Sequence, residues 1–300
     1  MASTFRSIPS AKAVAPYLFL APFLALFAAF IIVPLAYALY MSVFRDTLVG
    51  GRQFAGVANY LKVATDAKFW EGVGNLAIFG VVQVPIMLGL ALLFALILDR
   101  GHVYARNFFR LGIFIPYAVP SVIAALIWGY LYGPTFGPFT QLARALGTAP
   151  IDFLSRDVML FSIANIVTWE FVGYNMVIYY AALKALPPDL REAAMIDGAT
   201  PWQFAWTIQL PLLWPAILLT IIFSINGTLQ LFNEPYLMRS LAPSVINSSY
   251  TPNVYAYSLA TANQQYNYAA AVSFVLGIVI ASASLVFTAL TNRASRRSAS

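Results

Sequence analysis

Residues 187–215, PPDLREAAMIDGATPWQFAWTIQLPLLWP, are a polar stretch in a chain that otherwise consists mostly of long apolar runs. Two prolines open the stretch. Asp189 is placed to cap a helix that begins at Leu190, and Glu192 follows three residues later, at the spacing of a capping box. Gly198 would end this helix, because glycine enters the left-handed conformation without a Cβ clash.

A second helix should follow directly. Thr200 is its predicted cap, Pro201 takes the first helical position, and Gln203 repeats the capping-box spacing. Pro211 lies where this helix should break or pass into the next apolar run. The stretch therefore predicts a helix, an elbow and a second helix that form a compact, rigid feature on one face of a membrane.

The composition is that of an integral membrane protein. Of the 300 residues, 61% are hydrophobic and only 9% are charged, with a mean hydropathy of +0.76, whereas soluble domains are about 25% charged. Cysteine is absent, which excludes disulfides and thiolate metal sites. We therefore predict an all-α membrane protein that forms a single domain over residues 1–300.

The apolar runs predict six transmembrane helices, because about 20 residues cross the hydrocarbon core as a helix. They cover residues 15–44, 76–98, 111–131, 158–183, 212–232 and 269–290. The first run is too long for the apolar core of a signal peptide, so we expect it to be a retained span. The loop 187–211 then lies between spans four and five. The segment 233–268 is rich in Tyr, Asn and Gln and suits the membrane interface or contact with a partner.

The basic residues indicate how these spans are oriented. Segments 1–14, 99–110, 184–211 and 291–300 hold ten of the seventeen Lys and Arg residues but four of the eleven acids. Loops rich in Lys and Arg stay on the cytoplasmic side. We therefore predict a multi-pass protein of the cell membrane with both termini and the loop 187–211 in the cytoplasm. The formal charge of +6 follows from this topology and does not indicate a nucleic-acid partner.

Motifs for hydrolytic chemistry are absent from the sequence. It contains no Gly-x-x-x-x-Gly-Lys-Ser/Thr loop for nucleotide phosphates, no Gly-x-Ser-x-Gly and no His-Glu-x-x-His. The single histidine, His102, lies in a short basic loop and is expected to be solvated or interfacial. We therefore predict no catalytic residues, no metal site and no cofactor bound by this chain.

One acidic residue stands in the middle of a predicted span. Glu170 lies within residues 158–183, where an ionisable side chain costs at least about 2.5 kcal/mol, so it should face a cavity or a partner. Tyr174 is one helical turn further on and shares its face, and Asn175 is adjacent. The absence of a matching intramembrane Lys or Arg makes an acidic substrate less attractive.

Span five also carries polar residues at helical spacing. Two stripes contain them: Ser224 and Thr228, with Leu231 at the same spacing, in one, and Asn226, Gln230 and Asn233 in the other. Amides, carboxylates, hydroxyls and aromatic rings are the groups that bind sugars, and spans four and five supply all of them. The alternative is hydrogen bonding between helices, which Ser, Thr and Asn commonly provide in membranes.

The polar stretch also carries a family resemblance. The relevant residues are Glu192-Ala193-Ala194, Asp197-Gly198-Ala199, Phe204, Ile208, Leu210-Pro211 and Pro215. They resemble the EAA signature of the membrane subunits of binding-protein-dependent ABC importers. From about Tyr17 to about Asn292 the sequence is similar to the carbohydrate-uptake branch, with its maltose, lactose and glycerol-phosphate permease subunits.

The resemblance implies a heteromeric complex that works by alternating access. Its other members would be a second, related permease, two copies of a cytoplasmic ATPase that holds ATP and Mg, and an extracytoplasmic solute-binding protein that delivers a carbohydrate. The helix within the loop 187–211 would sit in a cleft of the ATPase and transmit its closure to the spans. The ATPase-coupling residues implied are Glu192, Ala193, Ala194, Asp197 and Gly198.

The resemblance also implies substrate contacts from the spans on either side of the EAA loop. The positions that correspond are Glu170, Phe171, Tyr174, Ser224, Gly227, Thr228 and Leu231, to which the spacing argument adds Asn175 and Gln230. Two rival functions stay open at this point. One is a transporter driven by an ion gradient, with Glu170 as the ion carrier. The other is a membrane enzyme for lipid-linked substrates, although the clustered acids that it needs are missing.

Overall fold

The computed structural model describes residues 11–47, 50–100 and 104–297, so that His102 lies outside the described residues. The chain is mostly helical. Its elements are α1 (Ala11–Phe27), a π-helical turn (Ala28–Ile32), α2 (Val33–Ser42), β1 (Phe44–Thr47), β2 (Gly51–Phe54), α3 (Ala58–Thr65), α4 (Ala67–Asp99), α5 (Arg106–Phe114), a 3-10 turn (Ile115–Ala118), α6 (Ser121–Leu131), α7 (Pro138–Ala145), α8 (Met159–Lys184), α9 (Asp189–Ile196), α10 (Pro201–Phe204), a π-helical turn (Ala205–Gln209), α11 (Leu210–Leu212), α12 (Trp214–Leu229), α13 (Asn233–Leu241), α14 (Pro252–Thr261) and α15 (Tyr266–Arg297).

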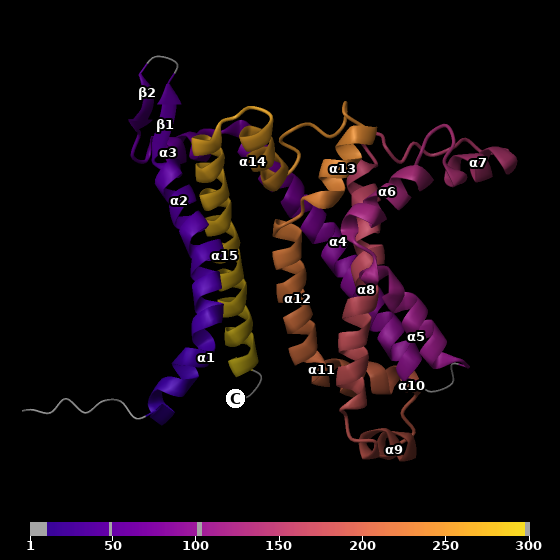
Figure 1. Cartoon of the computed structure of the whole chain (residues 1–300). Helices are drawn as coiled ribbons and strands as arrows, with labels where there is room; N and C mark the ends of the chain where they lie inside the picture. Colours follow the sequence, from indigo (N-terminus) through magenta and orange to yellow (C-terminus); the bar gives the residue numbers. More distant parts are fainter. Residues whose placement is uncertain (1–10, 48–49, 101–103, 298–300) are drawn as a thin grey trace, which may run out of the picture.

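A small hairpin departs from the predicted all-α fold. Strands β1 and β2 pair antiparallel, with Phe44 opposite Phe54, and the hairpin projects from one end of the molecule (Figure 1). Gly50 and Gly51 both have positive φ, 107° and 67°, which only glycine adopts without strain. The all-α prediction is therefore wrong for this short segment, because hydropathy alone does not register a two-glycine turn between polar strands.

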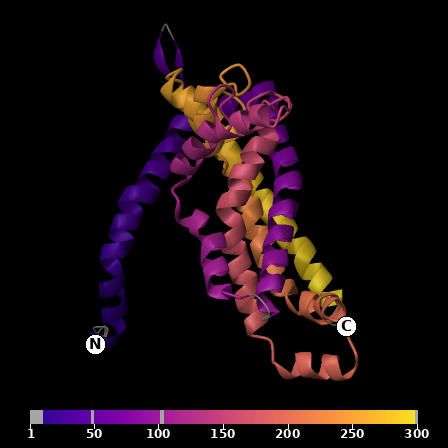
Figure 2. The same cartoon turned by 90° about the vertical axis from the view of Figure 1, so that its right-hand side faces the viewer.

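Three packed helices form the centre of the molecule. Helix α4 packs along α8, and α12 contacts both of them. On one side, α15 packs against α2, α3 and α14, and on the other side α5 and its 3-10 turn pack against α8. Helix α9 lies at the end opposite the hairpin and α14 (Figures 1 and 2). The two ends thus present different structures, a short polar elbow at one and a cap of short helices at the other.

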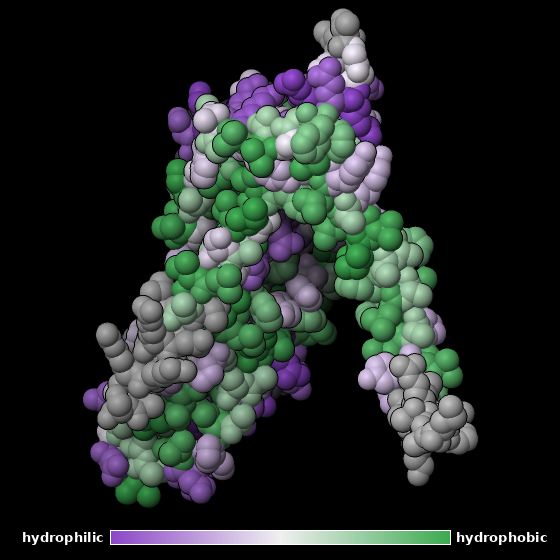
Figure 3. All heavy atoms as spheres, turned by 90° about the vertical axis from the view of Figure 1, so that its left-hand side faces the viewer, coloured by the Kyte–Doolittle hydropathy of each residue, from purple (hydrophilic) through white to green (hydrophobic). Residues whose placement is uncertain are grey.

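Within the described residues, three helices are long and apolar enough to cross a membrane by themselves: Pro16–Ser42, Ala67–Asp99 and Tyr266–Phe287. They correspond to the predicted runs 15–44, 76–98 and 269–290. The first of them is almost wholly exposed within this chain, and it stands away from the central helices in Figure 2. The middle of the surface seen in Figure 3 is largely apolar, and hydrophilic residues lie at both ends of the molecule, most densely at the end that carries the hairpin.

Two further predicted spans are bent. The run 111–131 turns by 100° between Ala118 and Ser121, so the helix predicted over these residues is broken into two parts. Pro116 begins the 3-10 turn and Pro120 caps α6, and proline cannot donate the backbone hydrogen bonds that would continue a helix. The segment Pro201–Leu212 meets α12 at 67°, close to Pro211 as expected. The run 158–183 coincides with the 26-residue α8.

The bend in the third run brings its backbone against α8. A Cβ atom on Gly173 would lie 2.0 Å from the carbonyl oxygen of Ile113 and 2.8 Å from Cα of Phe114. A glycine is therefore required at this crossing. The contact fixes the 3-10 turn, and with it Tyr117, against the face of α8 that carries Phe171 and Tyr174.

Candidate functional site

The elbow between α8 and α12 begins with a correction. Helix α9 starts at Asp189, its N-cap is Pro188, and no side chain caps it, so the predicted Asp189 cap is wrong. Pro188 already has helical backbone angles, which moves the helix start one residue forward and places Asp189 in the first turn. There its carboxylate, like that of Glu192, favours the positive end of the helix dipole.

The rest of the elbow follows the local prediction. Gly198 has φ +78° and ends α9, with the amide of Ala199 donating to the carbonyl of Ala194 at 2.9 Å. The predicted capping box is confirmed: the amide of Thr200 donates to Gln203 Oε1 at 2.8 Å, and the amide of Gln203 donates to Thr200 Oγ1 at 3.3 Å. Both turns of the elbow are therefore fixed by short-range hydrogen bonds.

The predicted coupling residues divide between two faces of this elbow. Glu192, Ala193, Asp197 and Gly198 are exposed, whereas Ala194 is buried. A partner can therefore touch the first four directly, while Ala194 packs inward. The exposed surface is extended by Met195 and Ile196, which are 67% and 86% exposed.

A buried carboxylate ties the elbow to the long helices. Asp99, the last residue of α4, is 4% exposed and forms ion pairs with Lys184, at 2.7 Å, and with Arg191 of α9. Gln209 Nε2 donates to the same carboxylate at 3.0 Å. The guanidinium of Arg191 also lies over the ring of Phe204, 5.7 Å from its centroid. The ends of α4 and α8, the elbow helix and the approach to α12 thus meet at one carboxylate.

A second carboxylate organises the opposite end of the molecule. Asp66, the N-cap of α4, accepts hydrogen bonds from Tyr255 at 2.7 Å and Tyr268 at 2.6 Å, as well as from the amide of Lys68. Burial alone would raise the pKa of Asp66, but these hydrogen bonds outweigh it and lower the pKa below its ordinary value. Part of the tyrosine-rich segment 233–268 is therefore held against α4 within the chain.

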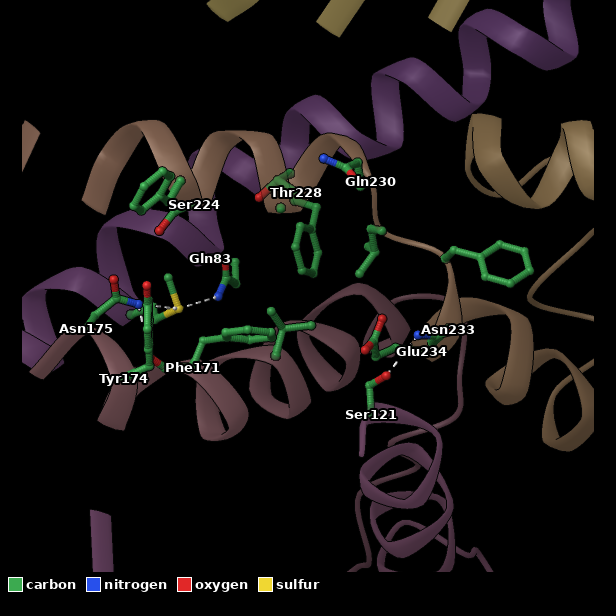
Figure 4. A pocket seen from close by; sticks show the side chains of 17 residues that line it. Gln83, Ser121, Phe171, Tyr174, Asn175, Ser224, Thr228, Gln230, Asn233 and Glu234 are labelled. Atoms are coloured by element: carbon green, nitrogen blue, oxygen red, sulfur yellow. Dashed lines mark hydrogen bonds between the residues drawn. The ribbon is translucent and has the colours of Figure 1, made fainter. Parts of the chain in front are cut away.

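A cavity of about 270 Å³ lies between the central helices (Figure 4). Its lining comes from α4, α6, α8, α12 and the start of α13. Eight of the nine predicted pathway residues line it: Phe171, Tyr174, Asn175, Ser224, Gly227, Thr228, Gln230 and Leu231. The structure adds Gln83, Ser121, Asn233 and Glu234 as polar lining residues. Most residues of the predicted stripes therefore face one common space. Asn226 is the exception, because its Oδ1 accepts a hydrogen bond from Ser284 Oγ of α15 at 3.0 Å and it does not line the cavity.

The cavity wall combines amides, hydroxyls and aromatic rings. Asn175 Nδ2 donates to the carbonyl of Phe171 at 2.9 Å, and Asn233 Nδ2 donates to Ser121 Oγ at 2.8 Å. Tyr117 stacks on Tyr174 with ring centroids 4.8 Å apart. The same Tyr117 ring meets Phe171 edge-on at 5.8 Å. These contacts hold the aromatic rings in place while several amide and hydroxyl groups remain directed at the cavity.

Glu170, the ninth predicted residue, does not line the cavity. It is 3% exposed, and its Oε2 has no hydrogen-bond partner in the described part of the chain. The lining stripe of α8 consists of Val167, Phe171, Tyr174 and Asn175. The prediction that Glu170 and Tyr174 lie on the same cavity-facing side of the helix is therefore wrong. The lining residues of α8 define a face that is rotated about the helix axis away from Glu170.

Comparisons with known proteins match most of the chain to membrane components of transport systems. Residues 87–299 match the family described as "Binding-protein-dependent transport system inner membrane component". The chain belongs to this family. It is 35% identical to the lactose transport system permease protein LacF of Rhizobium radiobacter, over 94% of this chain and 95% of the relative. It is 30% identical to the trehalose/maltose transport system permease protein MalF of Thermococcus litoralis, over 90% and 91% of the two chains.

The fold of this permease is also seen in a solved structure. A bacterial ABC transporter involved in the import of the acidic polysaccharide alginate contains a chain with a TM-score of 0.81 and 20% identity, over 94% of this permease and 98% of that chain. Family membership and the transport-system relatives support an ABC importer over an ion-gradient carrier. The permease is accordingly a transport subunit of the inner membrane.

Several polar residues of the permease were not predicted as functional from the sequence, among them Asp99, Glu234 and Gln83. Asp99 contributes to the prediction only as one of the four acids of the cytoplasmic segments, and Glu234 lies in the segment 233–268, for which interfacial or partner contacts are predicted. Gln83 stands inside the predicted second span, and its isolation in an apolar run was an available signal. The roles of Asp99 and Glu234 had no comparable signal, because their partners are far away in the sequence.

Proposed function

We propose that this permease carries a carbohydrate across the membrane through the cavity between α4, α8 and α12. The observation that carries the proposal is the cavity lining, in which amides and hydroxyls lie beside ordered aromatic rings inside a bundle of membrane-length helices. Sugars present hydroxyl groups and apolar ring faces, and this lining complements both. The names of the lactose and trehalose/maltose relatives support the same substrate class.

We propose six spans in a single domain over residues 1–300. Three are the long helices, two are the bent pairs, and the sixth is α8, whose 26 residues extend about 39 Å at 1.5 Å per residue. The charge distribution then places both termini and the loop 187–211 in the cytoplasm. The exposed apolar helix Pro16–Ser42 would face lipid and the second permease.

The elbow would be the docking element for a partner ATPase. Its support is the exposed face that contains Glu192, Ala193, Asp197 and Gly198, on a helix with hydrogen-bonded turns at its exit. Ala194 would act from inside the elbow as a small packing residue. In this scheme two ATPase subunits hold ATP and Mg, this chain binds no cofactor itself, and an extracytoplasmic binding protein delivers the sugar.

Motion of the elbow would reach the cavity through the spans that end beside it. ATP-driven closure of the ATPase pair would push α9, and the connection at Asp99 would pass the motion to α4 and α8. Both helices contribute to the cavity wall, so the cavity would open to the outside and reset after hydrolysis. Glu170 would support this wall from behind the stripe that contains Phe171.

The test is uptake of labelled neutral disaccharides into proteoliposomes that contain the co-purified complex. Ser224→Trp should fill the cavity and abolish uptake, whereas Leu219→Trp, at a 44% exposed position of the same helix, should retain it. A pull-down with mass spectrometry should recover a P-loop ATPase and a second permease. Uptake that survives ATP depletion but collapses with an uncoupler, or equal activity of the two variants, would contradict the proposal.

A further inference from the structure

The cavity contains a carboxyl group from the segment 233–268, for which the sequence predicts only interfacial or partner contacts. Glu234 lies in the first turn of α13 and lines the cavity beside Asn233, opposite the polar face of α12 (Figure 4). It is 6% exposed, so it belongs to the interior of the chain. Glu170 is buried behind the cavity wall on α8, the helix against which α13 packs.

Within the described residues, no basic side chain is paired with either of these two acids. None of the residues that line the cavity in the described part of the chain is Lys, Arg or His. Neither Glu170 nor Glu234 forms an ion pair with the described basic side chains, and Glu170 Oε2 has no hydrogen-bond partner there. A carboxylate or phosphate on a ligand would therefore enter a cavity that is lined by the carboxyl group of Glu234 and by none of the described basic residues.

Such an arrangement discriminates by charge. Burial of an anion is costly unless it is paired with a cation or fully hydrogen-bonded. A second acid nearby increases this cost, because like charges at short distance disfavour each other. A neutral sugar meets no such penalty, since a carboxyl group in either protonation state hydrogen-bonds a hydroxyl group.

We propose that Glu234, backed by Glu170, makes this half of the cavity selective for uncharged saccharides and excludes acidic ones. The inference rests on the proposed function and narrows its substrate class. Glu234 acts as a specificity-determining residue that touches the sugar, and Glu170 acts through it as a positioning residue. The selectivity belongs to the permease and adds to any selection by the binding protein.

The experiment measures equilibrium binding to the assembled importer without its binding protein, held with a non-hydrolysable ATP analogue. The probes are a labelled panel of neutral disaccharides that includes trehalose, together with trehalose 6-phosphate and a uronic-acid disaccharide. The wild-type complex should bind a neutral sugar at least about tenfold more tightly than an acidic one, the effect of one charge at short range. Glu234→Gln should reduce that ratio by about tenfold, and Glu234→Asp should preserve it.

Control variants separate this proposal from the proposed function. Glu71→Gln removes an exposed acid at the start of α4, outside the cavity, and should leave the ratio unchanged. If Glu234→Gln binds neutral sugars normally and still rejects acidic ones like the wild type, the filter is refuted while the transport function stands. If the wild-type complex binds neutral and acidic sugars equally tightly, the filter is likewise refuted while the transport function stands. Failure of every saccharide to bind or to be taken up refutes the proposed function, and the filter with it.

Discussion

Replacement of Gly173 by alanine tests how α8 meets the bent third span. The new Cβ atom would lie 2.0 Å from the carbonyl oxygen of Ile113, whereas ordinary contacts begin near 3.4 Å, so the two backbones must separate by about 1.4 Å. The obstacle is backbone on both sides, and a change of side-chain rotamer cannot relieve it. The 3-10 turn that carries Tyr117 would then move away from α8.

The expected cost follows from this separation. Overpacking of a filled interior costs about 1–3 kcal/mol, and a backbone clash belongs at the upper end of that range. The gain in helix propensity from Gly to Ala, about 1 kcal/mol, offsets part of it. A net loss of about 2 kcal/mol corresponds to a Tm about 4–8 °C lower for a domain of this size. Sugar uptake should also fall, because Tyr117 stacks on Tyr174 in the cavity wall.

The assay is thermal unfolding of the purified complex in one detergent, paired with uptake in proteoliposomes. Gly89→Ala in α4 is the matched control, because an added Cβ there has nothing within 4 Å. It should leave Tm unchanged or raise it slightly. If Gly173→Ala is as stable and as active as Gly89→Ala, the close approach of Ile113 to α8 does not constrain the fold.

Three further predictions concern the hydrogen-bonded clusters around Asp99 and Asp66 and the elbow between α8 and α12. Asp99→Asn removes the charge that Lys184 and Arg191 share and should lower the free energy of unfolding by about 1.5–3 kcal/mol. It should also lower the amount of sugar taken up per ATP hydrolysed in proteoliposomes. An unchanged ratio of uptake to ATP hydrolysis would contradict coupling through Asp99. Thr200→Val removes a capping oxygen and should cost about 1 kcal/mol, visible as faster amide exchange at the start of α10; unchanged exchange would contradict the cap. The lowered folded-state pKa of Asp66 means that its contribution to stability is present above its unfolded pKa of about 3.9 and is lost as the pH falls through the folded value. Asp66→Asn should therefore flatten the fall of Tm with pH below about pH 4, and a fall as steep as in the wild type would contradict this.

Most of the elbow could be predicted from residues that are close together in the sequence. The capping box at Thr200 and the left-handed stop at Gly198 are confirmed, because caps and turns depend on residues three or four positions apart. The Asp189 cap failed at the same range, since two consecutive prolines start the helix earlier than side-chain capping alone would. Local chemistry therefore predicted the elbow and erred by one residue at its entry.

The cavity required more than periodicity. Spacing along α8 and α12 predicted eight residues that face one space, because helix faces repeat every three to four residues. It misplaced Glu170 and omitted Glu234, whose position depends on α13 packing against α6 and α8. Whether a polar residue at the edge of a stripe faces the cavity or the packed interior is decided by the neighbouring helix.

The sequence by itself determined the membrane class, the positions of the long apolar helices and the two turns of the elbow. These features depend on hydropathy, on helical period and on hydrogen bonds between residues a few positions apart. Only the tertiary structure decided the junction at Asp99 and the position of Glu234 in the cavity. Asp99 meets Arg191 across 92 positions, and Tyr268 reaches Asp66 across 202. Such partners are selected by how helices pack in three dimensions, and no local pattern encodes that packing.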